Sequence, residues 1–90
     1  MNAEQIQFLL ACQKEEVEGA VIYRNLSKKV KSEDDRETLL RISRQEFAHA
    51  ELFARYTGRK VTPSRLKILW YSMLGVIFGY TFVIKVFEGN

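Results

Sequence analysis

Residues 42–53 read ISRQEFAHAELF and place Glu46 three positions before His49, the only histidine of the chain. On a helix, residues three apart project from one face, so both side chains can reach the same ligand. They share a stripe with three apolar residues, Leu39, Ile42 and Phe53. We therefore expect residues 33–57 to form a long helix whose inward face carries a glutamate and a histidine.

The residues before this helix predict another, over residues 3–30, which Asn2 caps and no proline interrupts. One stripe of it collects Ile6, Leu9, Gln13, Glu16, Ala20, Tyr23 and Val30. Glu16 therefore lies in a largely apolar face, where a carboxylate must be paired, protonated or bound to metal. Glu15 lies at the edge of this face and Glu18 points away from it, so we expect both to be solvated.

A short turn separates the two predicted helices. Ser32 caps the second helix, acidic residues fill its first turn, and Gly58 ends it. Two long helices joined by a short turn pack as antiparallel neighbours. Glu16 precedes the turn by about as many residues as Glu46 and His49 follow it. The three polar side chains should therefore meet at one depth.

Residues 63–87 predict a third helix, with Thr62 as its cap and Pro63 as its first residue. Within it, residues 68–84 carry no charge and are apolar around the whole circumference, apart from a few small residues. This stretch is a little shorter than the roughly 20 residues that span a bilayer. This stretch can lie either in the core of an oligomer or in contact with a membrane.

The converging residues predict half of a metal site. A di-iron carboxylate centre takes a Glu from each of two helices and a Glu-x-x-His unit from each of two others. One chain supplies Glu16, Glu46 and His49, so a two-fold dimer would complete the centre and a four-helix bundle. These ligands suit iron, with manganese or zinc as substitutes. The alternative is a core histidine hydrogen-bonded to Glu46 or Glu16, without metal.

Other polar residues lie close to this half-site in the sequence. Tyr23 follows Glu16 by two turns on the same stripe, where it is a candidate catalytic residue that can hydrogen-bond a ligand carboxylate or donate to bound oxygen species. The alternative is an ordinary core residue. Gln13 is a weaker candidate for a supporting hydrogen bond. We expect Cys12 to be inert packing.

Composition limits the classes of function. Hydrophobic residues make up 47% and charged residues 28% of the chain, which fits an ordered globular domain. Acids and bases occur in separate blocks, which argues against a nucleic-acid groove lined by bases and aromatics. One cysteine excludes an internal disulfide, and the N-terminus lacks a signal-peptide pattern. We expect a cytoplasmic protein, with membrane association through residues 68–84 as the alternative.

These residues resemble a known family. Glu16 with Tyr23 seven positions later, followed by Glu46-x-x-His49, is similar to the first half of the di-iron domain of rubrerythrins, in the ferritin-like superfamily. The resemblance implies a carboxylate-bridged di-iron centre that oxidises Fe(II) or reduces peroxide. It also implies O2 or peroxide as the substrate and an external electron donor.

The chain is still more similar to rubrerythrin-like domains fused to vacuolar-iron-transporter-type membrane domains, called membrane-bound ferritins. In these, a stretch comparable to residues 56–59 and 65–67 leads into a hydrophobic segment similar to residues 68–84. The family continues into a second helical half with a further Glu-x-x-His, which is absent from this sequence. We therefore expect either the N-terminal part of a longer protein or a stand-alone half that dimerises.

Together these patterns predict an all-α fold. A ferritin-like antiparallel helical hairpin occupies residues 1–62, a hydrophobic helix occupies residues 63–90, and a homodimer completes a four-helix bundle. The favoured function is that of an iron-binding oxidoreductase. The alternatives are a non-enzymatic helical dimerisation or membrane-docking module, and a protein that captures metal for a transporter.

Overall fold

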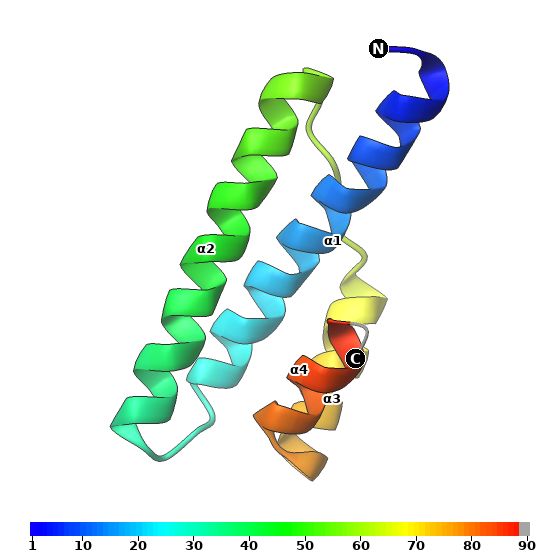
Figure 1. Cartoon of the computed structure of the whole chain (residues 1–90). Helices are drawn as coiled ribbons and strands as arrows, with labels where there is room; N and C mark the ends of the chain where they lie inside the picture. The colour runs from blue at the N-terminus through cyan, green and yellow to red at the C-terminus, as the bar shows by residue number, and fades with distance from the viewer. Residues whose placement is uncertain (89–90) are drawn as a thin grey trace.

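A computed structural model describes residues 1–88, which form helices and no strand. The helices are α1 (Ala3–Ser27), α2 (Glu33–Thr57), α3 (Arg65–Phe78) and α4 (Tyr80–Phe87). α1 and α2 form a long antiparallel hairpin, and α3 and α4 lie beside the half of α1 that is nearer the turn (Figure 1). The prediction of an all-α fold with a helical hairpin is confirmed.

Asn2 and Gly58 cap α1 and α2 at the end of the hairpin that lies away from the turn. Asn2 Oδ1 accepts a hydrogen bond from Gln5 N at 2.8 Å and Gln5 Oε1 accepts one from Asn2 N at 3.0 Å, which is the predicted capping box. At the far end of α2, Gly58 adopts a φ of 65°, a conformation that glycine reaches without a steric penalty. These boundaries of α1 and α2 are those predicted.

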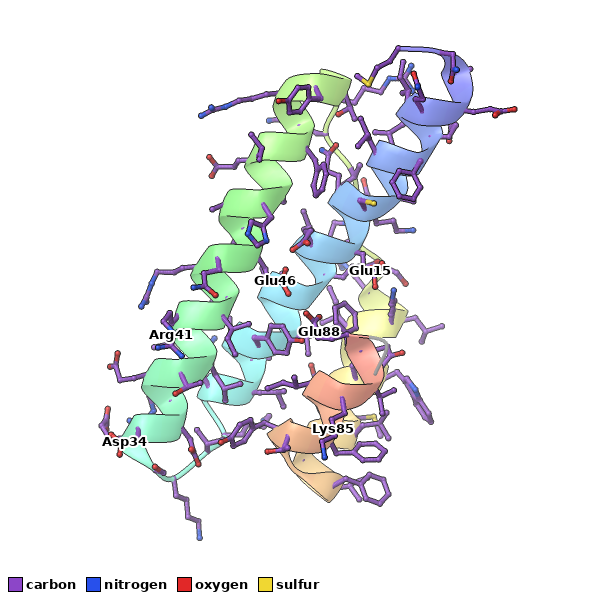
Figure 2. All side chains as sticks on the ribbon, viewed as in Figure 1. Glu15, Asp34, Arg41, Glu46, Lys85 and Glu88 are labelled. Atoms are coloured by element: carbon purple, nitrogen blue, oxygen red, sulfur yellow. The ribbon has the colours of Figure 1, made fainter. Side chains whose placement is uncertain are left out.

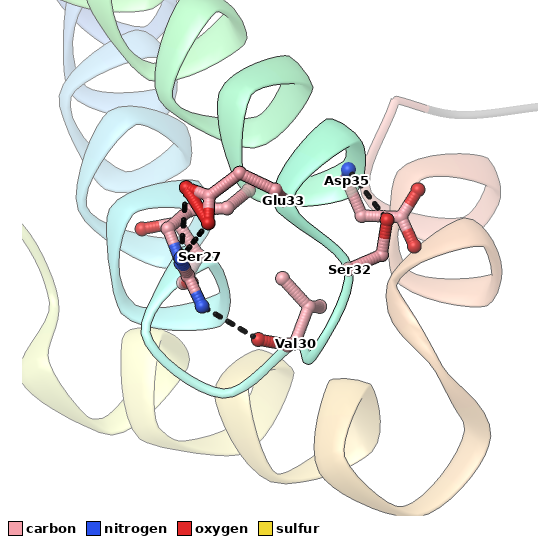
Figure 3. A network of polar contacts seen from close by, with 6 residues as sticks. Ser27, Val30, Ser32, Glu33 and Asp35 are labelled. Atoms are coloured by element: carbon pink, nitrogen blue, oxygen red, sulfur yellow. Dashed lines mark hydrogen bonds and ion pairs between the residues drawn. The ribbon is translucent and has the colours of Figure 1, made fainter.

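The turn between α1 and α2 is held by Arg36 (Figure 3). Its guanidinium donates to Ser27 O at 3.4 Å and to Val30 O at 3.3 Å, and it pairs with Glu33 at 2.7 Å. Ser32 Oγ accepts a hydrogen bond from Asp35 N at 3.3 Å and caps α2 as predicted. The carbonyls at the end of α1 thus find donors. α1 ends at Ser27 rather than at residue 30, because the chain already turns there.

The prediction of one helix over residues 63–87 is wrong at two points. α3 begins at Arg65, and its cap is Ser64, whose Oγ accepts a hydrogen bond from Lys67 N at 3.2 Å. Gly79, with a φ of 93°, ends α3 and lets α4 fold back along it. The end of α4 therefore returns to the middle of α1 (Figure 1).

The prediction that Glu18 is solvated is also wrong, since only 1% of this residue is exposed. Its Oε2 accepts a hydrogen bond from Ser64 N at 2.7 Å, and its Oε1 pairs with Lys67 Nζ at 3.2 Å. A carboxylate at a helix N-terminus is stabilised by the helix dipole and the free amides there. Glu18 therefore fixes the start of α3 against α1.

The core lies where α3 and α4 meet the hairpin. Its buried residues are Ile22, Tyr23, Leu26, Leu39, Val83 and Phe87. The Phe87 ring packs edge-on against Tyr23 and Tyr71, with centroids 6.2 Å and 5.2 Å apart. No helix among residues 1–88 combines the length and the hydropathy required to cross a bilayer. This core holds the end of α4 against α1.

Candidate metal centre

Three potential metal ligands converge at mid-height on the hairpin. Glu16 on α1 and Glu46 and His49 on α2 each offer a ligand atom, and these atoms lie within 4.8 Å of one another. His49 Nδ1 is 3.5 Å from Glu16 Oε2 and 3.9 Å from Glu46 Oε2. The predicted meeting of these side chains at one depth is therefore confirmed, while their role as metal ligands stays a prediction.

The cluster is closed toward the core and open toward solvent. The exposed fraction of the side chain rises from 10% for Glu46 through 25% for Glu16 to 59% for His49. The prediction that His49 occupies a core position is therefore wrong for the single chain. The reason is that α3 and α4 lie beside the other half of the hairpin, nearer the turn (Figure 1).

Glu16 carries a buried oxygen that lacks a hydrogen-bond partner among residues 1–88. This atom is Oε2, and the 3.5 Å approach of His49 Nδ1 is too long for a good hydrogen bond. Burial raises the pKa of the Glu16 carboxyl, His49 opposes this shift, and the charges of Glu88 and Glu15 reinforce it. A buried carboxylate oxygen without a hydrogen-bond partner lowers the stability of the folded state. A cation bound at this oxygen would remove that loss of stability.

Sequence reasoning missed a third carboxylate at the site, that of Glu88. The end of α4 brings Glu88 close to Glu46 (Figure 2). Both residues, together with Glu16, line two cavities of about 240 and 310 Å³ on the open side of the hairpin. One signal could have drawn attention to it, because Glu88 is the first acidic residue after Glu51. Its position next to Glu16, however, depends on the break at Gly79.

Tyr23 joins this third carboxylate to the core. Its hydroxyl donates a hydrogen bond to Glu88 Oε2 at 3.0 Å, and the rest of the side chain is buried beside the cluster. Burial raises the pKa of Tyr23, and the charge of Glu88 and the hydrogen bond to it act in the same direction. Tyr23 therefore stays protonated and keeps its role as a donor. A hydrogen bond to one of the predicted ligand carboxylates was one of the roles left open for Tyr23, but its partner is Glu88.

Gln13 and Cys12 lie one helical turn away from Glu16. Gln13 Nε2 donates to Arg59 O at 2.7 Å, and its Oε1 accepts a hydrogen bond from Thr57 Oγ1 at 2.8 Å. The prediction of a supporting role at the cluster is therefore wrong for Gln13, whose amide joins α1 to the segment after α2. Cys12 is a half-buried free thiol that lines the smaller of the two cavities.

A family model described as Rubrerythrin matches residues 7–69, more than half of the chain. The match includes Glu16, Glu46 and His49 and ends within α3, before Glu88. The comparison with curated proteins and the comparison with solved structures each found no match. The likeness to transporter-fused domains stays a prediction. On the strength of the family match, the chain belongs to the rubrerythrin family.

Proposed function

We propose that the chain binds iron through Glu16, Glu46 and His49, and that two chains together hold a carboxylate-bridged di-iron centre. The observation that carries this proposal is the convergence of two carboxylates and an imidazole around the unpaired Glu16 Oε2. Membership of the rubrerythrin family supports iron as the metal. The donor set also fits, because oxygen-rich ligation with one imidazole suits Fe(II) better than it suits thiolate-seeking ions.

A second chain would supply the other half of the ligands. Glu16, Glu46 and His49 are half of the set that such a centre requires. The largely exposed His49 side chain marks the side from which a partner would approach. Exposed Phe8, Leu52 and Tyr56 lie on the same half of the hairpin and would be covered by a second hairpin. We propose a homodimer for these reasons.

The residues of the chain have separate tasks at such a centre. Glu46 has the least exposed side chain of the three and would hold a metal from the core side, while the largely exposed His49 would hold it from the solvent side. Tyr23 holds its proton on the hydroxyl oxygen and fixes the Glu88 carboxylate beside Glu16. Bound iron would supply one-electron redox chemistry, for which Fe(II) oxidation or peroxide reduction with an external electron donor is the expected outcome.

Metal binding is tested by anaerobic equilibrium dialysis against Fe(II). We expect Glu46→Gln and His49→Ala each to weaken binding more than about tenfold. The control is Glu51→Gln, an exposed carboxylate on the same helix. Equal affinity in all four proteins, or no binding by the wild type, would refute the proposed site. Circular dichroism confirms that each variant remains helical.

The second candidate is a non-enzymatic interaction module. The exposed apolar residues of α3 and α4 favour it, since large apolar patches mark interaction sites. Oxygen consumption separates the two functions. If the chain is an oxidoreductase, the wild type should consume O2 faster than the His49→Ala variant after Fe(II) is added in air. Equal rates in the two proteins would favour the interaction module.

A further inference from the structure

The outer face of α3 carries an unusual apolar surface. Large hydrophobic side chains are exposed along it at helical spacing, and we call them the α3 ridge: Leu66, Leu69, Trp70, Met73, Val76 and Ile77. Their positions fall within one stripe about a third of the helix circumference wide. The opposite face of α3 packs on α1, where Gly75 allows close contact with Leu26. α3 is therefore apolar on both faces, and the chain itself covers only one.

Bases border the α3 ridge on one side. Lys28, Lys29 and Arg65 line a groove between α1 and α3, and this groove shares Leu69 with the ridge. No acidic residue occurs between Leu52 and Phe87. Two acids of the neighbouring helices have partners, since Glu18 pairs with Lys67 and Asp35 accepts a hydrogen bond from Tyr80. The surface thus combines exposed apolar side chains with charges of a single sign.

We propose that the α3 ridge binds the surface of an anionic phospholipid bilayer, with Lys28, Lys29 and Arg65 contacting the phosphate headgroups. An exposed apolar stripe bordered by bases is the pattern of a helix that lies in the membrane interface. Trp70, which is 58% exposed, has the side chain most typical of that interface. The 14 residues of α3 are too few to cross a bilayer, so the helix lies along the surface.

Charge favours a lipid surface over a second copy of the chain as the occupant. In a two-fold dimer the same patch meets itself. Lys28, Lys29 and Arg65 would then face their own copies across the contact, with no acid of the patch to pair with them. Anionic headgroups provide the complementary charge. This proposal is independent of the metal centre, which lies on the hairpin near His49.

Vesicle co-sedimentation tests the proposal, with vesicles of phosphatidylcholine alone and of phosphatidylcholine with phosphatidylserine. We expect binding to the anionic vesicles only, and weaker binding at high salt. Lys28→Gln with Lys29→Gln should weaken it about thirtyfold. Arg41→Gln with Arg44→Gln is the matched control, since it removes the same charge from an exposed position on α2. Trp70, the only tryptophan, reports insertion through a blue shift of its fluorescence.

Several outcomes would overturn the proposal. Equal binding to neutral and anionic vesicles, or equal loss in the control variant, would exclude recognition of the lipid charge. Failure to bind either vesicle would exclude the lipid surface. A dimer in sedimentation velocity that Leu69→Gln with Trp70→Gln dissociates, together with no vesicle binding, would assign the α3 ridge to a second copy. Circular dichroism shows whether each variant keeps its fold.

Discussion

The Tyr23 hydroxyl donates a hydrogen bond to Glu88 Oε2 at 3.0 Å and so joins the C-terminal part of α1 to the end of α4. The Phe87 ring next to it packs edge-on against Tyr23. This relationship places a third carboxylate beside Glu16 and Glu46. The candidate centre therefore depends on α4 as well as on the hairpin.

Tyr23→Phe removes the hydroxyl and leaves the ring in place. We expect the free energy of unfolding to fall by about 1 kcal/mol, because Glu88 is exposed and can regain a hydrogen bond from water. Fe(II) affinity should fall as well if Glu88 has to be held at the site. Urea denaturation measures the first effect and equilibrium dialysis the second. Unchanged values for both would show that the hydrogen bond has no role.

Glu16→Gln tests the cost of the buried carboxylate in the metal-free chain. Burial raises the pKa of Glu16 above its ordinary value of 4.5, so the folded state holds this proton more tightly than the unfolded state. Glu16 thus favours folding below pH 4.5, and this contribution is lost as pH rises through the raised pKa. The variant should be more stable than the wild type at neutral pH, with a difference that vanishes below pH 4.5.

Urea denaturation across this pH range provides the measurement for Glu16→Gln. Glu15→Gln is a suitable control, because Glu15 is exposed on the same helix. A variant less stable than the wild type at neutral pH would mean that His49 compensates fully for the buried charge. In that case Glu16 Oε2 would no longer support the proposal of a bound metal.

Gly19→Ala tests how closely α4 approaches the centre. A Cβ at Gly19 would lie 2.9 Å from Phe87 Cε2 and 3.4 Å from Glu46 Oε1. Alanine gains about 1 kcal/mol of helix propensity, but overpacking of this kind costs about 1–3 kcal/mol. We expect net destabilisation in urea and weaker Fe(II) binding. If the variant is more stable than the wild type, the Phe87 ring does not lie as close to Gly19 as we describe.

Lys67→Met tests the buried pair between Glu18 and α3. The substitution leaves the Glu18 carboxylate without its cation, and we expect a loss of about 2 kcal/mol, limited by the partial exposure of Lys67. Adding Glu18→Gln should recover part of this loss, because the amide can still accept the hydrogen bond from Ser64 N. Additive losses in this double-mutant cycle would contradict a direct interaction.

Spacing along the hairpin was enough to predict the cluster of Glu16, Glu46 and His49. The i, i+3 spacing and the short turn fix how these residues meet, and both are local properties. Glu18 was missed because α1 packs against α2 on one side and α3 on another, whereas a single apolar stripe describes only one partner. Glu88 was missed because its place depends on the left-handed backbone at Gly79, which a helical pattern does not reveal.

Stoichiometry as a function of chain concentration tests the shared iron site most directly. We predict that an anaerobic Fe(II) titration saturates at about one iron per chain. The apparent affinity should rise with chain concentration, because a metal held between two chains stabilises the dimer. Sedimentation velocity should show a dimer that forms with iron and is weakened by Glu46→Ala. Absence of saturable binding, or full binding by the Glu46→Ala variant, would contradict the account.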